Sequence, residues 1–207
     1  MMSQKVKAKH LSAGQKIGIL LGGCILVCII VLLITAPWKG TKKMIYADIT
    51  IKDYGTVTVE LDSEMAPITV ANFVKLSKSG FYDGLTFHRI MAGFMAQGGD
   101  PEGTGFGGSE ETIKGEFLVN GVKNTLSHTR GTISMARSKS YDSASSQFFI
   151  VHQDATFLDG KYAAFGHVTS GMDVIDRICQ DARPIDNNGS IAPADQPVIE
   201  SIKIRES

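Results

Sequence analysis

The pattern of apolar and polar positions divides the chain into two unlike parts. Residues 17–36 contain no charged side chain, whereas after residue 43 apolar residues recur in short alternating runs separated by turn residues. A helix of about 20 residues, rising about 1.5 Å per residue, spans the roughly 30 Å hydrocarbon core of a bilayer. The pattern therefore predicts a transmembrane signal-anchor helix over residues 17–37, ahead of a folded domain.

Three other interpretations of the apolar run are less favoured. A buried helix of the domain would show a polar side facing solvent, whereas this run is apolar on every face. A cleaved signal peptide has a shorter apolar region and a site of small residues, whereas this run ends in bulky residues and Pro37. A lipoprotein signal places its apolar region before the lipidated cysteine, yet most of this run follows Cys24. The predicted organisation is a basic segment (1–16), the anchor (17–37), a tether (38–43) and one domain (44–207).

The charge distribution bears on location and partners. The formal net charge of the 207 residues is +0, but the residues before Met44 carry seven lysines and no acidic side chain. The domain is therefore negative, which argues against nucleic acid as a partner. Four of these lysines precede the apolar run and three follow it, which weakly favours a cytoplasmic N-terminus. We expect a single-pass protein of the cell membrane with an extracytoplasmic domain.

The alternation within the domain predicts mostly strands. Residues 47–52 and 56–61 both alternate with period two around a turn at 53–55, which indicates a β-hairpin. Helical spacing of apolar residues predicts helices over 68–80 and 171–179. Further strands are predicted at 131–137, 146–151, 162–168 and 198–204. Many short strands with two helices favour a closed antiparallel barrel with the helices over its ends.

One stretch combines core-like residues with chemistry. Residues 87–100 read as two short strands joined by a bend, and they carry Arg89 and Gln97 among apolar side chains. In the strand 146–151, Gln147 and Phe149 share one face because side chains alternate along a strand. The pattern predicts a shallow apolar pocket bordered by a cation and two amides, suited to a small apolar group on a peptide backbone.

The sequence of the domain lacks the motifs of phosphate-binding, metal-binding and serine hydrolase sites. The glycine-rich residues 103–108 do not form the phosphate-binding pattern between a strand and a helix, although so long a loop can form the wall of a site. The histidines show no metal-ligand spacing, and Cys179 is the only cysteine of the domain. Neither Ser145 nor Ser146 lies in a nucleophile elbow. We expect no metal, no cofactor and no intradomain disulfide.

A series of motifs resembles one family. The segments 87–90, 94–100, 131–136, 146–150 and 157–161 are similar, in order, to the motifs of cyclophilins, the peptidyl-prolyl cis-trans isomerases, and the likeness covers residues 44–207. The resemblance implies an eight-stranded antiparallel barrel capped by two helices, with a proline-binding groove on its outer face. It implies isomerisation of X-Pro bonds in polypeptide substrates. A binding module with little turnover is the alternative.

The resemblance also implies roles for individual residues. Arg89 is the expected catalytic residue. The expected substrate-binding residues form a proline pocket, orient the peptide backbone or line the groove: Phe94, Met95, Gln97, Ala136, Arg137, Gln147, Phe149, Phe157, Leu158 and Tyr162. Phe157 stands where an indole is common and Tyr162 where a histidine is common, as in bacterial members. Phenylalanine lacks the donor of an indole, so we expect weak cyclosporin binding, and we expect a monomer.

Overall fold

The computed structural model describes residues 43–207. The predicted basic segment, transmembrane helix and nearly all of the tether lie outside the described residues. Within residues 43–207, none of the helices has the length and apolar character needed to cross a bilayer.

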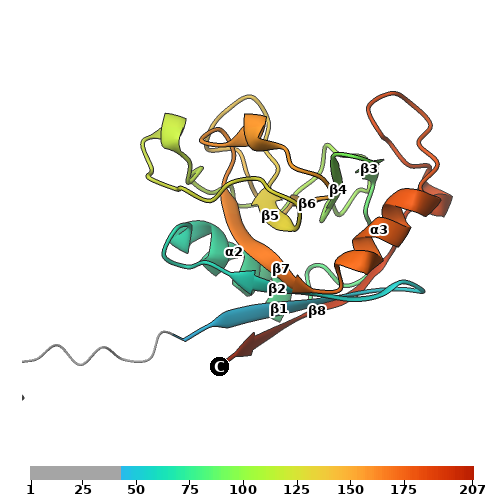
Figure 1. Ribbon diagram of the computed structural model, residues 1–207, viewed down its shortest axis with the longest axis horizontal. Helices are drawn as coiled ribbons and strands as arrows, with labels where there is room; N and C mark the ends of the chain where they lie inside the picture. The colour runs from blue at the N-terminus through green and yellow to red at the C-terminus, as the bar shows by residue number, and fades with distance from the viewer. Residues whose placement is uncertain (1–42) are drawn as a thin grey trace, which may run out of the picture. The chain divides into compact units, whose positions relative to one another are not determined.

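Eight strands and two α-helices make up the described part of the chain (Figure 1). The helices are α2 (Pro67–Lys78) and α3 (Met172–Asp181), and three short 3-10 helices lie at Leu118–Asn120, Thr156–Leu158 and Pro193–Asp195. The strands are β1 (Ile45–Ile51), β2 (Gly55–Leu61), β3 (Arg89–Met91), β4 (Met95–Gly98), β5 (Thr132–Met135), β6 (Phe148–Val151), β7 (Ala164–Ser170) and β8 (Ile199–Glu206).

All strands belong to one antiparallel sheet in the order β3-β4-β6-β5-β7-β2-β1-β8. The predicted hairpin is confirmed, because β1 pairs with β2 from Ile45–Leu61 to Ile51–Gly55. Its turn requires left-handed backbone at Asp53 (φ 64°) and a positive φ at Gly55 (114°). Aspartate and glycine tolerate these conformations better than most residues do, which explains the turn.

The expected closed barrel is not supported, because the sheet order has two ends, β3 and β8, and forms a half-barrel. Irregular backbone joins these ends: the Phe87 amide donates to the Pro197 carbonyl at 2.9 Å, and Thr86 forms an isolated bridge with Val198. Pro197 has no N–H to donate to a ladder, so regular pairing cannot continue through it.

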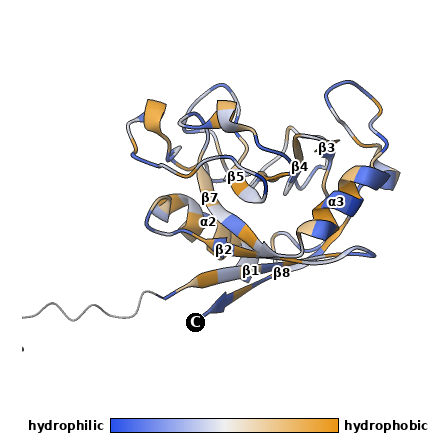
Figure 2. Ribbon diagram, viewed as in Figure 1, coloured by the Kyte–Doolittle hydropathy of each residue, from blue (hydrophilic) through white to orange (hydrophobic). Residues whose placement is uncertain are grey.

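Both predicted helices are present, and sequence-distant contacts stabilise the start of α2. Ala66 caps α2 without a side-chain hydrogen bond. The buried Glu116 carboxylate accepts from the Ile68 and Thr69 amides instead, at 3.0 and 2.7 Å. These amides have no partner within the helix, and a negative charge is favourable at a helix N-terminus. Figure 2 shows α3 as alternating hydrophilic and hydrophobic bands, as expected for a helix with one buried face.

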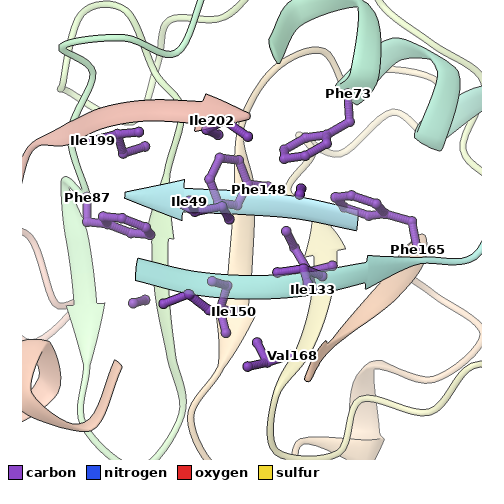
Figure 3. Packing of buried hydrophobic residues seen from close by; sticks show 14 of the residues in the cluster. Ile49, Phe73, Phe87, Ile133, Phe148, Ile150, Phe165, Val168, Ile199 and Ile202 are labelled. Carbon is purple, nitrogen blue, oxygen red and sulfur yellow. The ribbon is translucent and has the colours of Figure 1, made fainter. Parts of the chain in front are cut away.

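The strands that carry the site bury side chains on both faces. On the inner face, Phe148 and Ile150 pack in the main core with side chains from the other strands and α2 (Figure 3). On the outer face, Met95, Phe149 and Val151 form a second apolar cluster. The alternation of side chains along β4 and β6 therefore builds a core on one side and an apolar surface for a site on the other.

Candidate active site

Three strands place a cation, an amide and an aromatic ring in one row. Arg89 of β3 lies opposite Gln97 of β4, and Gln97 lies opposite Phe149 of β6. Because directly opposed residues of antiparallel strands point to the same face, the three side chains share the outer face. Phe149 belongs to the second apolar cluster, so the row lies outside the main core.

A cavity of about 510 Å³ opens over this row. Its lining contains all the residues predicted for the site except Gln147: Arg89, Phe94, Met95, Gln97, Ala136, Arg137, Phe149, Phe157, Leu158 and Tyr162. Gln147 lines an adjoining cavity of about 460 Å³, which shares Gln97, Ala136 and Arg137 with the first. The structure thus brings the predicted residues together, while their individual roles remain predictions.

The polar contacts of the Arg89 guanidinium are all with neutral groups. Its Nε donates to the Asn188 carbonyl at 2.7 Å, and Nη1 donates to Gln97 Oε1 at 3.2 Å. Burial lowers the pKa of Arg89, and the nearby Tyr162 and Asp186 oppose that change. Arginine remains charged in proteins even so. The site therefore presents a fixed, half-buried positive charge beside an apolar cavity.

The floor of the first cavity is apolar. Met95, Phe149 and Leu158 are all buried in the second cluster. Phe94 and Phe157 pack against each other at its edge, with ring centroids 5.6 Å apart. Such a surface favours a compact apolar ring over a charged or hydrated group.

Two glutamines continue the row toward the second cavity. Gln97 Nε2 donates to Gln147 Oε1 at 2.9 Å. Gln147 Nε2 in turn donates to the carbonyls of Gly105 (3.1 Å) and Gly107 (2.7 Å). The chain of hydrogen bonds from Arg89 through both amides to the glycine-rich loop fixes the orientation of every side chain in it.

Arg137 is held among aromatic rings. Its guanidinium carbon lies 4.5 Å from the ring centre of Tyr162 and 5.2 Å from those of Phe117 and Tyr141. Its Nε and Nη2 donate to the Lys161 carbonyl, at 3.2 and 2.8 Å. Arg137 therefore forms a rigid wall at the junction of the two cavities, stabilised by cation–π contacts.

Six lining residues of the first cavity were not predicted: His88, Thr104, Gly105, Phe106, Asn188 and Ser190. The glycine-rich loop was expected to form a wall of a site, and three of the six belong to it. Asn188 and Ser190 come from a turn-rich segment whose only sequence signal is its run of Asp, Asn and Gly. Nothing in that signal indicates that the turn contacts Arg89, which lies 99 residues away along the chain.

His88 is buried next to the cavity, and neither of its ring nitrogens has a hydrogen-bond partner within residues 43–207. Burial lowers the pKa of His88, an effect that Asp100 opposes and Arg89 adds to. Burial would raise the pKa of Asp100, but backbone amides of the glycine-rich loop, including those of Glu102 and Gly105, outweigh it and lower that pKa. The His88 ring beside the cavity is therefore neutral at physiological pH.

Comparisons with known proteins agree with this geometry. The family described as cyclophilin type peptidyl-prolyl cis-trans isomerase/CLD matches residues 46–206. Peptidyl-prolyl cis-trans isomerase B of Bacillus subtilis is 50% identical over 123 residues, which cover 59% of this chain and 82% of that protein. Peptidyl-prolyl cis-trans isomerase-like 2 of Rhizopus delemar is 43% identical over 150 residues, 72% of this chain but only 27% of that longer protein.

The structural likeness extends over the whole described domain. The crystal structure of a cyclophilin type peptidyl-prolyl cis-trans isomerase of Cryptosporidium parvum is similar, with a TM-score of 0.69 and 31% identity over 79% of this chain and 99% of that one. The same Cryptosporidium protein has also been solved in the presence of the dipeptide Ala-Pro. With a half-barrel, two helices and a family match over nearly all of residues 43–207, this chain belongs to the cyclophilin family.

Proposed function

We propose that the cavity beside Arg89 accelerates cis–trans rotation about X-Pro peptide bonds. One observation carries the proposal: a guanidinium fixed by neutral acceptors borders an apolar cavity of about 510 Å³ in a cyclophilin domain. Family membership and relatives that are named peptidyl-prolyl cis-trans isomerases support the same activity.

The chemistry requires few groups. Rotation about a peptide bond faces a barrier of about 18–20 kcal/mol because the C–N bond has partial double-bond character. In the twisted state the prolyl nitrogen lone pair has left the amide resonance and can accept a hydrogen bond. A guanidinium that donates to this lone pair stabilises the twisted state and not the planar ground state, which is the requirement for catalysis.

The remaining groups fit the parts of a proline-containing peptide. The apolar floor formed by Met95, Phe149 and Leu158 suits the pyrrolidine ring. The amides of Gln97 and Gln147 suit the polar peptide backbone on either side of the ring. An Ala-Pro dipeptide was present in one structure of the Cryptosporidium relative, which supports the same assignment here.

Isomerase kinetics on a short X-Pro peptide test this function. We expect Arg89→Ala to lower kcat/KM by about two orders of magnitude or more, since it removes a charged donor from the twisted state. Arg183→Ala is a matched control, because the Arg183 guanidinium is exposed and donates to the neighbouring carbonyls of its own segment. Wild-type activity no higher than that of Arg89→Ala would contradict an enzymatic role.

The alternative, a binding module with little turnover, predicts a different pattern. Proline-containing peptides would then bind to the wild-type protein with measurable affinity, while isomerisation stayed at the uncatalysed rate. Nuclear magnetic resonance exchange measurements on one peptide report both quantities at once. The Arg89 guanidinium, whose direct polar contacts are with neutral groups, favours turnover, because a site for binding alone has no need for a donor held beside the amide nitrogen.

For the whole chain, we propose that the segment 17–37 anchors this domain in the cell membrane, where it assists the folding of exported or membrane-proximal proteins. Slow proline isomerisation limits the folding of many chains, and a tether raises the local concentration of the enzyme. Support comes from the uncharged run of residues 17–36. Protease added to intact spheroplasts should degrade the domain, and full protection would contradict the outside orientation.

We further propose that cyclosporin binds weakly to this groove. Phe157 is largely exposed at the cavity edge and packs on Phe94, but it offers no donor where an indole is common in the family. A hydrogen bond between neutral groups is worth about 1 kcal/mol. Titration with cyclosporin should therefore show that Phe157→Trp binds it about fivefold more tightly than the wild-type protein does. Equal affinities would contradict the proposal.

A further inference from the structure

Phe106 is an aromatic side chain that the protein leaves almost uncovered at its active site. It is 94% exposed, the highest value among the large apolar side chains of the described residues. It also lines both the first and the second cavity. A single exposed apolar residue is ordinary on a protein surface, but one that borders two adjoining cavities is placed where a ligand can cover it.

The backbone around Phe106 is held firmly. The Asp100 carboxylate accepts from the amides of Thr104 (3.0 Å) and Gly105 (2.6 Å). On the other side, Gln147 Nε2 donates to the carbonyls of Gly105 and Gly107, the two residues that flank Phe106. The ring is therefore presented from a fixed loop, so little backbone entropy is lost when a ligand contacts it.

Glycines surround Phe106 for steric reasons. Gly105 has a φ of +88°, which disfavours any other residue there. A Cβ at Gly107 would overlap the Asp100 carboxylate, and one at Gly108 would overlap the Ser145 hydroxyl. Among residues 105–107, position 106 is the one that carries a side chain without a positive φ or an overlap, and in this chain that residue is a phenylalanine.

We propose that Phe106 determines substrate specificity, by providing an apolar platform for a large apolar or aromatic side chain within two residues of the substrate proline. The proposal rests on the isomerase function proposed above. A peptide whose proline occupies the first cavity extends about 3.3 Å per residue, so a neighbouring side chain reaches the junction of the two cavities where Phe106 lies. The favoured substrates are thus X-Pro segments with nearby apolar residues, such as unfolded chains expose.

The polar lining of the second cavity binds an acidic substrate side chain less favourably than Phe106 binds an apolar one. Its walls carry the hydroxyls of four serines and the amides of Gln97 and Gln147. Its one cation, Arg137, directs its donors to the carbonyls of Lys161 and Ser138 and lies over aromatic rings. Three of its five N–H groups are occupied in this way, so a substrate carboxylate finds fewer free donors than at an open arginine, whereas the face of Phe106 is uncovered.

The test is isomerase kinetics on a peptide series built on one alanine-rich X-Pro peptide. Phe, Leu or Glu replaces alanine, one at a time, at the two positions on either side of the proline. For wild-type protein we expect kcat/KM to be about fivefold higher for Phe than for Ala at one of these positions, as for an aromatic pair. Phe106→Ala should bring that ratio close to one, and Phe106→Leu should leave an intermediate ratio.

A control and a stability measurement complete the design. Leu118 is also exposed, at 64%, and lines neither cavity, so Leu118→Ala should keep the wild-type ratio. Thermal unfolding should be the same for wild type and Phe106→Ala, since the ring makes few contacts. An unchanged Phe-to-Ala ratio in Phe106→Ala, or a preference for Glu, would overturn the specificity proposal alone. Wild-type protein that is inactive on every peptide would overturn the isomerase function and the proposal with it.

Discussion

Arg89 depends on a loop that is distant in sequence. Its Nε donates to the Asn188 carbonyl, and the Ile90 amide donates to the Gly189 carbonyl at 2.8 Å. A Cβ at Gly189 would lie 2.5 Å from a Met91 side-chain carbon, and its φ is +89°, so only glycine allows so close an approach. The guanidinium is therefore positioned by a turn as well as by its own strand.

Asp186 holds that turn in place. Its Oδ1 accepts from the amides of Asn188 and Ser190, each at 2.9 Å. We expect Asp186→Ala to lower kcat by about three- to tenfold with KM little changed, because a small displacement of Arg89, the proposed donor, destabilises the twisted state more than the bound ground state. Kinetics on a single X-Pro peptide would measure the two constants separately.

Two further variants distinguish positioning from a general loss of stability. Asp62 accepts from the Glu64 and Met65 amides in the same way, but outside the lining of the first cavity, so Asp62→Ala is the matched control. Asp186→Asn keeps an oxygen acceptor and should recover most of kcat. If Asp186→Asn were as impaired as Asp186→Ala, the negative charge beside Arg89, and not the turn, would be the cause.

For single residues, the sequence identified polar side chains that lie within otherwise apolar strands. Arg89 and Gln97 were recognisable as polar residues in apolar strands, and the family motifs supplied the apolar floor. Asn188 and His88 were not recognised as parts of the site. A carbonyl acceptor is a property of backbone placement, and a buried histidine has the same local pattern whether or not it borders a cavity.

Among the secondary-structure elements, the close approach of neighbouring strands determines how tightly the sheet can curve. Gly166 of β7 lies opposite Leu61 of β2 and Ile133 of β5. A Cβ there would overlap the Glu60 carbonyl oxygen, a backbone atom fixed in the sheet. Glycine at this position therefore allows the central strands to curve tightly into the half-barrel.

Gly166→Ala should accordingly destabilise the domain. We expect the free energy of unfolding to fall by about 2–3 kcal/mol, the usual result of inserting an atom into a packed region. Gly121→Ala is the control: a Cβ there meets nothing within 4 Å, and only its φ of +79° disfavours alanine, at about 1 kcal/mol. Urea unfolding measures both, and a loss for Gly166→Ala no greater than that for Gly121→Ala would contradict the predicted cost of overlap with the Glu60 carbonyl.

Element types were predictable where the periodicity was strong. The hairpin of β1 and β2 and both helices are present because their apolar spacing matches the faces they bury. Closure of the barrel was not predictable from the same signal. It depends on whether β3 and β8 pair regularly. Instead, the chain next to them forms only an isolated bridge between Thr86 and Val198, beside Pro197, which has no N–H to donate. Alternation specifies which face a strand buries, and it does not specify how the sheet ends.

For the domain as a whole, two buried histidines link stability to pH. His128 is fully buried, with Nδ1 2.8 Å from Asp159 Oδ1 and Nε2 3.0 Å from the Ser134 hydroxyl. Burial lowers the pKa of His128, although Asp159 opposes the change. Burial lowers the pKa of His88 as well. Both therefore bind a proton less readily in the folded protein than in the unfolded chain.

The sign of the pH dependence follows from this difference. As pH falls through the ordinary histidine value of 6.5, the unfolded chain takes up protons that the folded domain does not. The free energy of unfolding therefore decreases on acidification, by up to about 1.4 kcal/mol per pH unit for each histidine. Asp100 and Asp159 have lowered pKa values, so their stabilising effect is lost only below the ordinary value of 3.8. The window from pH 7 to pH 5 thus isolates the histidines.

We expect urea unfolding of the purified protein to show a steady loss of stability between pH 7 and pH 5. His128→Gln removes one titrating group and keeps hydrogen-bonding atoms near Asp159 and Ser134. The free energy of unfolding of this variant should be lower at pH 7 but should fall less steeply toward pH 5. The slope should be smaller by the contribution of one histidine. The slope is informative because lost packing shifts the whole curve without changing its dependence on pH. An identical slope in both proteins would mean that protonation of His128 does not contribute, and a rise in stability on acidification would contradict the neutral state of both buried rings.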